Sequence, residues 1–162
     1  MLKHILVPLD QSELSETAIE YARNILSPDI DSKITFLYVV DIPATSYTVT
    51  PEAYAMSIDS GIEEYENLKA SMRESAAAYL NRVAGYSRKD QEHTEVCVES
   101  GDPAETILEI AEERKVDAIV MSTHGRSGFT RWVFGSVTQK VLSAAPCPVF
   151  VIPRKKEKKG KK

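Results

Sequence analysis

The stretch Asp117-Ala-Ile-Val-Met-Ser-Thr-His-Gly-Arg-Ser-Gly-Phe-Thr-Arg-Trp-Val-Phe-Gly-Ser136 joins a short apolar run to a glycine-rich loop and to the start of another helix. Residues 118–121 are apolar and residues 122–128 are small or polar. Three of the seven glycines lie between positions 125 and 135. Glycine lets a backbone approach a ligand closely, and a helix N-terminus presents unpaired N–H groups to anions. The stretch therefore predicts either a phosphate cradle after a buried strand or an ordinary strand-to-helix loop.

Four more runs of residues predict strands in the same sheet. Residues 4–9 and 34–40 are apolar and rich in branched side chains, which is typical of strands that are buried on both faces. Residues 94–99 alternate between polar and apolar side chains, and residues 149–152 are apolar. Pro8 marks where pairing of the first strand stops, because proline cannot donate to a ladder. With the apolar run of the opening stretch, these make five predicted strands.

Segments with helical spacing of apolar residues separate the predicted strands. The first helix follows Asp10 and Ser12, both of which suit a helix cap. The second is predicted for residues 62–83, after a loop that is long for a compact domain. The other two begin at Asp102-Pro103-Ala-Glu105 and near Ser136. The predicted inward-facing residues of the first two helices are Leu14, Ala18, Ala22, Ile25, Leu68, Met72, Ala76, Tyr79, Leu80 and Val83.

Strands that alternate with helices predict right-handed crossovers and a parallel sheet, in a doubly wound α/β domain over residues 1–153. In such sheets, ligands bind beyond the carboxyl ends of the strands. Four stretches lie at those ends and together form what we call the carboxyl rim: residues 8–10, 39–41, 101–102 and 121–128. We therefore expect one ligand site at the carboxyl rim.

The composition fits a domain with a substantial core and no membrane span. The chain has 162 residues, 43% of them hydrophobic, and no apolar run reaches the roughly 18 residues that a spanning helix needs. The apolar run near the N-terminus is too short for a signal peptide and lacks a cleavage site of small residues. Cys97 and Cys147 form no C-x-x-C pair. We expect two reduced cysteines that fill core space in a cytoplasmic protein.

The charge is unevenly distributed along the chain. Residues 154–162 carry seven basic and one acidic side chain, a net charge of +6 that leaves −10 for residues 1–153 out of the overall −4. Such a tail cannot bury apolar surface, and we expect it to be disordered. It would either solubilise the protein or touch nucleic acid or anionic lipid. The acidic body argues against nucleic acid as the main partner.

The glycine-rich loop differs from other nucleotide-binding motifs. A Walker loop requires a lysine after its second glycine, and no lysine follows the glycines here. The G-x-G-x-x-G pattern is also missing from this loop. Asp10 follows the first predicted strand, but the remaining acidic and lysine residues of a phosphorylated receiver domain have no counterpart at the expected strand ends.

Five motifs, taken together, point to a known family. They are Ile5-Leu-Val-Pro-Leu-Asp10, Gly101-Asp-Pro-Ala104, Met121-Ser-Thr-His-Gly-Arg-Ser-Gly128, Gly135-Ser-Val137 and Ala145-Pro-Cys-Pro-Val-Phe-Val-Ile152. Over about residues 1–153, the chain resembles the universal stress protein (UspA-like) family. The resemblance implies a five-stranded parallel sheet of order 3-2-1-4-5, Rossmann-like and of the adenine nucleotide alpha hydrolase-like kind. It also implies a regulatory or sensor protein of the stress response that binds ATP or AMP.

The ATP-binding branch of that family carries the loop motif G-x2-G-x9-G-[ST]. Gly125 matches the second glycine, nine residues follow it, and Gly135-Ser136 completes the pattern. Ser122 stands where the motif has its first glycine. A serine would cost on the order of 1 kcal/mol if this position needed a positive φ, or it would keep the backbone contact and add a hydroxyl.

The resemblance implies a role for each matching residue. Pro8 and Leu9 would wall the adenine, and the backbone of Val39 would hydrogen-bond to it. Asp10 would lie near the ribose or a phosphate-bound Mg²⁺ ion. Two further sets complete the site: Met121 and Ser122 facing the ribose, and Gly125, Gly135, Ser136 and Val137 holding the phosphates. A helix N-terminus favours anions, so the physical chemistry agrees for the last set.

Several of these residues also have structural interpretations. Asp10 either caps the first helix or serves the site, and Arg126 is either a phosphate partner or a solvated loop arginine. We expect His124 to be an exposed loop residue, and Trp132 and Phe134 to pack into the core instead of stacking on adenine.

Catalysis has little support in the sequence. We find no pair of nucleophile and base, and the only group suited to ATP hydrolysis is Asp10, which more naturally holds a metal ion. We expect at most slow ATP hydrolysis. The apolar strand at residues 148–152 would otherwise be an exposed sheet edge. In the resembling family this strand pairs across a dimer axis, so we expect a homodimer. The alternatives are a dimeric interaction module that binds no nucleotide, and a slow ATPase.

Overall fold

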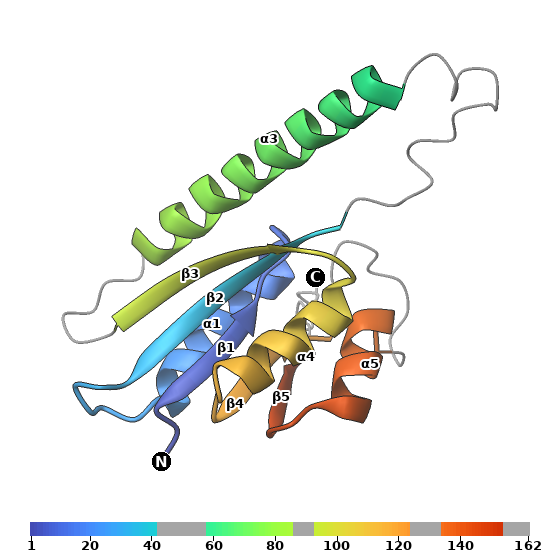
Figure 1. Ribbon diagram of the computed structural model, residues 1–162. Coiled ribbons are helices and arrows are strands. Elements are labelled where there is room, and N and C mark those ends of the chain that lie inside the picture. The colour runs from blue at the N-terminus through green and yellow to red at the C-terminus, as the bar shows by residue number, and fades with distance from the viewer. Residues whose placement is uncertain (42–57, 86–92, 124–133, 154–162) are drawn as a thin grey trace, which may run out of the picture.

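The computed structural model describes residues 1–41, 58–85, 93–123 and 134–153, and the side chains of residues 58–64 are left out of the description (Figure 1). The described elements, in chain order, are β1 (His4–Pro8), α1 (Glu13–Ile25), β2 (Lys33–Val40), α3 (Ile58–Gly85), β3 (His93–Ser100), α4 (Pro103–Glu113), β4 (Ala118–Ser122), α5 (Ser136–Ala144) and β5 (Val149–Ile152). No helix among the described residues is long and apolar enough to cross a membrane.

The five strands form one parallel sheet in the order β3-β2-β1-β4-β5. β1 lies at the centre, where Val7 pairs with Phe36 of β2 and Leu6 pairs with Ile119 of β4. The chain moves outward from β1 in both directions, so the order reverses between β1 and β4. This confirms the predicted doubly wound sheet and places its topological switch point at the ends of β1 and β4.

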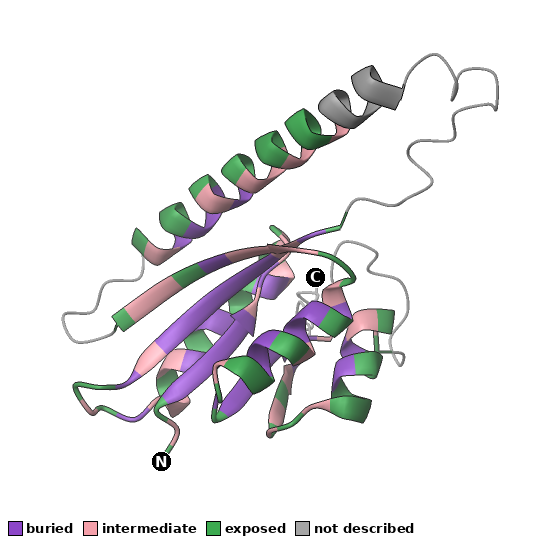
Figure 2. Cartoon of the chain, in the orientation of Figure 1, coloured by how far each residue is buried: buried purple, intermediate pink, exposed green. Residues whose placement is uncertain are grey.

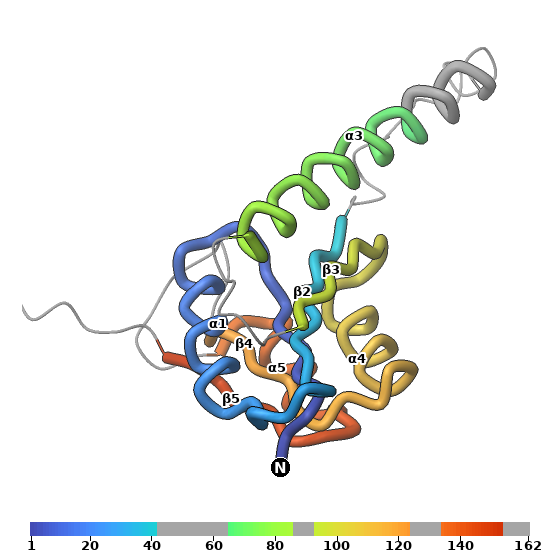
Figure 3. The backbone as a smooth tube through the Cα atoms, turned by 90° about the vertical axis from the view of Figure 1, so that its left-hand side faces the viewer, coloured from blue at the N-terminus to red at the C-terminus, as the bar shows by residue number. Residues whose placement is uncertain are grey.

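Helices cover both faces of the sheet and enclose two cores (Figures 1 and 3). Ile5 and Val7 of β1 lie in a cluster with Leu80 of α3, on the face that α1 also covers. Leu6 points to the opposite face, where it lies in a second cluster with Val141 of α5. Side chains of a strand alternate between faces, so one central strand supplies both cores. The central strands are accordingly the most buried part of the molecule (Figure 2).

Two well-formed caps explain where α1 and α4 begin. The Ser12 hydroxyl accepts from the Ser15 amide at 3.1 Å, so Ser12 is the cap of α1 and Asp10 is not. Asp102 Oδ1 accepts from the amides of Ala104 and Glu105 at 2.9 and 3.0 Å. These caps satisfy amides that have no partner within their own helix.

Three boundary and burial predictions were wrong. α3 starts at Ile58, earlier than the predicted residue 62, and its N-terminal half extends beyond the sheet (Figure 1). Leu68 therefore meets no core surface and is 43% exposed. Phe134 is 48% exposed because it immediately precedes α5, outside both core clusters. Cys97 is buried as predicted, and Cys147 is half-buried beside the second core.

A network of polar side chains lies at the amino ends of the strands, opposite the carboxyl rim. His4 is buried, and its Nε2 lies 2.9 Å from the Thr35 hydroxyl. The Glu95 carboxylate belongs to the same network, where it forms ion pairs with Lys33 at 2.9 Å and with Arg114 at 3.5 Å. Burial lowers the pKa of His4 most, and the charge of Lys33 lowers it further. Glu95 and a hydrogen bond with the Arg114 backbone raise the pKa in part, and the charge of Arg114 lowers it slightly. His4 is therefore held neutral in the folded protein.

We expect His4 to make the protein less stable in mild acid. The unfolded chain takes up a proton at His4 near the ordinary pKa of about 6.5, whereas the folded protein resists it until a lower pH. The free energy of unfolding should thus fall as the pH drops below 6.5, by up to about 1.4 kcal/mol per pH unit. Urea unfolding at several pH values should show a flatter dependence for His4→Gln. The same change at the exposed His93 is the control, and an unchanged slope in His4→Gln would contradict the assignment.

Candidate functional site

The end of β1 supplies the first part of the carboxyl rim. The Leu9 amide donates to the Leu37 carbonyl at 2.8 Å, which continues the pairing with β2 past Pro8. Leu9 is buried, whereas Pro8 and Asp10 are half-buried and lie at the carboxyl end of β1. Pro8 and Asp10 thus lie at the switch point, while the Leu9 side chain packs in the first core cluster.

A strained turn fixes Asp10 beside the start of α1. Gln11 has a φ of 68°, a left-handed conformation that costs a non-glycine residue about 1 kcal/mol. Asp10 Oδ1 accepts from the Ser12 amide at 3.1 Å and from the Ser12 hydroxyl at 2.6 Å. These two hydrogen bonds hold the turn in place and orient the Asp10 carboxylate. Asp10 does not cap α1.

The end of β2 lies next to the start of α4. Val39 is half-buried and Val40 is buried, and the Val40 carbonyl accepts from the Gly101 amide at 3.2 Å. Gly101 has a φ of +151°, and a Cβ there would lie 3.0 Å from the Thr106 hydroxyl oxygen. Only glycine suits this crossing, so Gly101 keeps the Gly101-Asp102 turn close to β2.

The start of α5 is held directly against the end of β4. The Gly135 amide donates to the Thr123 carbonyl at 2.9 Å. The Thr138 hydroxyl lies within hydrogen-bonding distance of the carbonyls of Ser122 and Thr123, at 3.1 and 3.2 Å. Gly135 is the cap residue of α5, and among the described residues no side-chain hydrogen bond caps this helix. The positive end of a helix dipole therefore lies at the switch point, an arrangement that suits an anion.

Thr138 is a site residue that the sequence did not reveal. In the sequence it is one of several threonines in predicted helices, and only the fold brings its hydroxyl to the two carbonyls. It is 3% exposed, so no solvent replaces these bonds if they are lost.

We expect Thr138→Val to loosen the attachment of α5 to β4. The substitution keeps the shape of the side chain but removes the one buried hydroxyl that the Ser122 and Thr123 carbonyls share. The Thr123 carbonyl still accepts from the Gly135 amide, so the loss falls on the Ser122 carbonyl and should cost about 1–3 kcal/mol in the free energy of unfolding. Urea unfolding measures this cost. Thr17→Val is the matched control, because the Thr17 hydroxyl donates to the Leu14 carbonyl at 2.6 Å on the exposed side of α1. Equal small effects of both substitutions would contradict the role of Thr138.

The structure brings most of the predicted site residues to one rim. Those found at strand ends or at the start of α5 are Pro8, Leu9, Asp10, Val39, Met121, Ser122, Gly135, Ser136 and Val137. The Met121 side chain packs in the second core cluster, so only its backbone is left for a ligand. Gly125 and Arg126 lie outside the described residues, as do His124 and Trp132.

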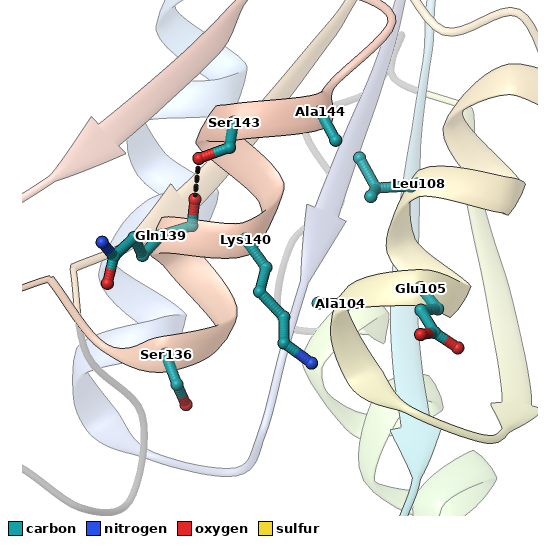
Figure 4. A pocket seen from close by; sticks show the side chains of 8 residues that line it. All are labelled: Ala104, Glu105, Leu108, Ser136, Gln139, Lys140, Ser143 and Ala144. Carbon is teal, nitrogen blue, oxygen red and sulfur yellow. Dashed lines mark hydrogen bonds between the residues drawn. The ribbon is translucent and has the colours of Figure 1, made fainter.

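A groove between α4 and α5 begins at the same helix end (Figure 4). Its lining includes Leu108 and Ala144 on its apolar side, and Ser136 lies at one end. The Lys140 ammonium group pairs with Asp102 Oδ2 at 3.3 Å, which links α5 to the cap of α4. The groove thus shares Ser136 with the candidate site but runs away from the switch point.

The described residues contain no cluster of three or more His, Cys, Asp or Glu side chains that could hold a metal ion. Asp10 is the carboxylate at the switch point. An Mg²⁺ ion there would therefore need ligands from a bound phosphate group in addition to Asp10.

Comparison with known proteins identifies the family of this chain. The sequence model of the universal stress protein family matches residues 1–153. The chain belongs to the universal stress protein family. This confirms the resemblance drawn from the five motifs, and it agrees with the doubly wound sheet whose order reverses between β1 and β4.

Known universal stress proteins resemble this one over nearly its whole length. Universal stress protein MJ0531 of Methanocaldococcus jannaschii is 31% identical over 159 residues, which are 97% of this chain and 85% of the relative. The solved structure of the hypothetical protein MJ0577 is 28% identical and has a TM-score of 0.77, with 97% of this chain and 99% of that chain covered.

Two more distant structures share the fold and contain nucleotides. An Arabidopsis thaliana universal stress protein with AMP bound is 18% identical, with a TM-score of 0.62 over 94% of this universal stress protein and 92% of the other chain. A universal stress protein in complex with cAMP is also 18% identical, with a TM-score of 0.60 over 94% and 97% of the two chains.

Proposed function

We propose that this universal stress protein binds an adenine nucleotide, ATP or AMP, at the carboxyl rim and acts as a regulatory or sensor dimer in a stress response. The observation that carries the proposal is the start of α5. Gly135 begins this helix with no side-chain cap among the described residues, and Gly135 and Thr138 hold it against the end of β4. A phosphate group is the ligand that this helix end would favour.

The proposed nucleotide runs from the end of β1 toward α5. As the family resemblance implies, Pro8, Leu9 and the backbone of Val39 would contact the adenine. The Leu9 side chain packs in the first core cluster, so its contact would be made by its backbone. Asp10 would lie by the ribose or by a phosphate-bound Mg²⁺ ion. The phosphates would meet the amides of Gly135, Ser136 and Val137 and the Ser136 hydroxyl, together with Gly125 and Arg126 of the loop motif.

Ser122 bears on the proposal because it replaces the first glycine of the loop motif. Its side chain is 7% exposed, and its carbonyl is bound by Thr138. It ends β4 as part of the regular ladder, where it pairs with Ile152. Ser122 is not among the described residues with a positive φ. Serine therefore meets no backbone strain here, so backbone strain gives no argument against binding.

Relatives support the choice of ligand. Universal stress proteins of the same fold have been solved with AMP and with cAMP. Both ligands contain adenine, ribose and a phosphate group, which are the three parts that the carboxyl rim would accommodate. We propose the same chemical class here and regard hydrolysis as slow at most.

We further propose that the protein is a cytoplasmic homodimer that pairs through β5. This strand lies at one edge of the sheet, with Val149 and Val151 half-buried and Phe150 40% exposed. An edge strand of this composition favours pairing with a second strand. A second copy of the chain would pair with β5 and cover Phe150.

Two measurements test the proposal: which nucleotide the purified protein carries, and which nucleotides raise its melting temperature. The protein is purified, denatured and analysed by mass spectrometry for released nucleotides, and its melting temperature is measured with AMP, Mg-ATP and Mg-GTP. We expect released AMP or ATP, or a rise in melting temperature with adenine nucleotides above that with Mg-GTP. Finding no released nucleotide and no shift would instead favour an interaction module of the same fold.

A further inference from the structure

Tyr79 on α3 is a buried residue whose ring is fixed on several sides. It is 5% exposed, and its ring makes an edge-to-face contact with Tyr38 of β2, with a centroid distance of 6.2 Å and an interplanar angle of 71°. The guanidinium carbon of Arg82 lies 5.6 Å from the centroid of the same ring. These contacts fix the orientation of the ring, and they therefore fix the position of its hydroxyl group.

The Tyr79 hydroxyl reaches the first turn of α1. It donates to Glu16 Oε1 at 3.0 Å. Burial raises the pKa of Tyr79, the Glu16 carboxylate raises it further, a hydrogen bond with the Ser15 side chain opposes them, and the charge of Asp10 adds a small increase. The phenol therefore stays protonated, and it lies close to Ser15, Glu16 and Asp10.

Hydrogen bonds continue from this turn to Asp10. The Ser15 hydroxyl donates to the Ser12 carbonyl at 2.8 Å and lies 3.3 Å from the Asp10 amide, from which it accepts. The Ser12 hydroxyl then donates to Asp10 Oδ1 at 2.6 Å. The left-handed Gln11 lies inside this network, so a strained turn depends on the bonds around it.

We propose that Tyr79 is a positioning residue for the nucleotide site. By holding the first turn of α1, it fixes the strained turn of residues 10–12 and so the direction of the Asp10 carboxylate at the carboxyl rim. This inference rests on the proposed function, because Asp10 is the group that would face the ribose or the Mg²⁺ ion. It also gives α3 a part in the site.

The first test uses the ligand-free protein. Hydrogen exchange of the Asp10 and Ser12 amides is measured by NMR in the wild type, in Tyr79→Phe and in Tyr21→Phe. Tyr21 is 38% exposed on α1, so it provides the same chemical change away from the network. We expect Tyr79→Phe to speed exchange at both amides about tenfold, and Tyr21→Phe to leave it unchanged. Equal exchange in all three proteins would overturn the inference.

The second test separates positioning from a general loss of stability. Calorimetry gives the Kd of Mg-ATP and of AMP for the wild type, Tyr79→Phe, Asp10→Asn and the double variant. We expect Tyr79→Phe to weaken one or both ligands about five- to tenfold in the wild-type background, and to have no further effect once Asp10 is changed. Equal weakening in both backgrounds would overturn the inference. If the wild type binds no adenine nucleotide, the proposed function fails, whereas the exchange result still decides whether Tyr79 fixes the turn.

Discussion

Gly135→Asp is expected to abolish nucleotide binding while leaving the protein at least as stable as the wild type. Aspartate is a good helix cap, and its carboxylate would accept from the first-turn amides of α5. The same carboxylate would occupy the amides proposed for the phosphates and repel the ligand's negative charge. We expect the Kd of AMP and of Mg-ATP to rise at least about 100-fold, which corresponds to about 2.8 kcal/mol.

Opposite effects on stability and binding make this substitution informative. Calorimetry measures the Kd, and urea unfolding measures the free energy of unfolding, which should be unchanged or a few tenths of a kcal/mol higher. Gly135→Asn is the matched control, because it has nearly the same size and also caps a helix but carries no charge. We expect it to weaken binding by less than about tenfold. If Gly135→Asp bound nucleotide as the wild type does, the phosphate position proposed at α5 would be wrong.

Phe150→Asp is expected to convert the proposed dimer into a monomer. A carboxylate in the middle of β5 would have to be buried against a second copy of the same strand, and two like charges would face each other across the axis. We expect the dissociation constant of the dimer to rise at least about 100-fold. Sedimentation velocity over a range of protein concentrations measures this change.

The sheet provides its own control for the dimer prediction. Val96 lies on β3, the opposite edge strand, and is 38% exposed, close to the 40% of Phe150. Val96→Asp introduces the same charge on the other edge and should leave the dimer intact. Dissociation by both substitutions would point to a general loss of structure, and dissociation by Val96→Asp alone would assign the interface to β3.

The strands were predictable because local sequence carries that information. Residues 4–8 and 118–122 are apolar at every or nearly every position, and only strands buried on both faces of a parallel sheet need this composition. The order of the strands followed from the resemblance carried by the five motifs. The start of α4 was also predictable, since Asp102 and Pro103 are adjacent in the sequence and act within one turn.

The residues that orient the candidate site were not predictable in the same way. Thr138, Tyr79 and Glu16 act across the fold, through contacts between residues that are far apart in the sequence. Gln11 carries no sign of its left-handed conformation, because the hydrogen bonds of Ser12 and Ser15 maintain it. Such residues appear as ordinary core or surface positions until the elements are packed together.

The burial errors have a related cause. Leu68 lies at the correct helical spacing for an inward-facing residue, and the periodicity of α3 gives no signal of where the sheet beneath it ends. Phe134 is a large apolar residue next to a helix start, for which burial is the common outcome. Leu68 is exposed because α3 extends beyond the sheet, and Phe134 is exposed because it precedes α5, outside both core clusters.

The most direct test of the proposed function is an NMR titration of the ¹⁵N-labelled protein with AMP. We predict that the largest shifts occur at the amides of Gly135, Ser136 and Val137, with further shifts at Leu9 and Val39. Leu108 and Ser143, in the groove between α4 and α5, should hardly move. No shifts at millimolar AMP, or shifts confined to that groove, would contradict the proposal that this universal stress protein binds adenine nucleotide at its carboxyl rim.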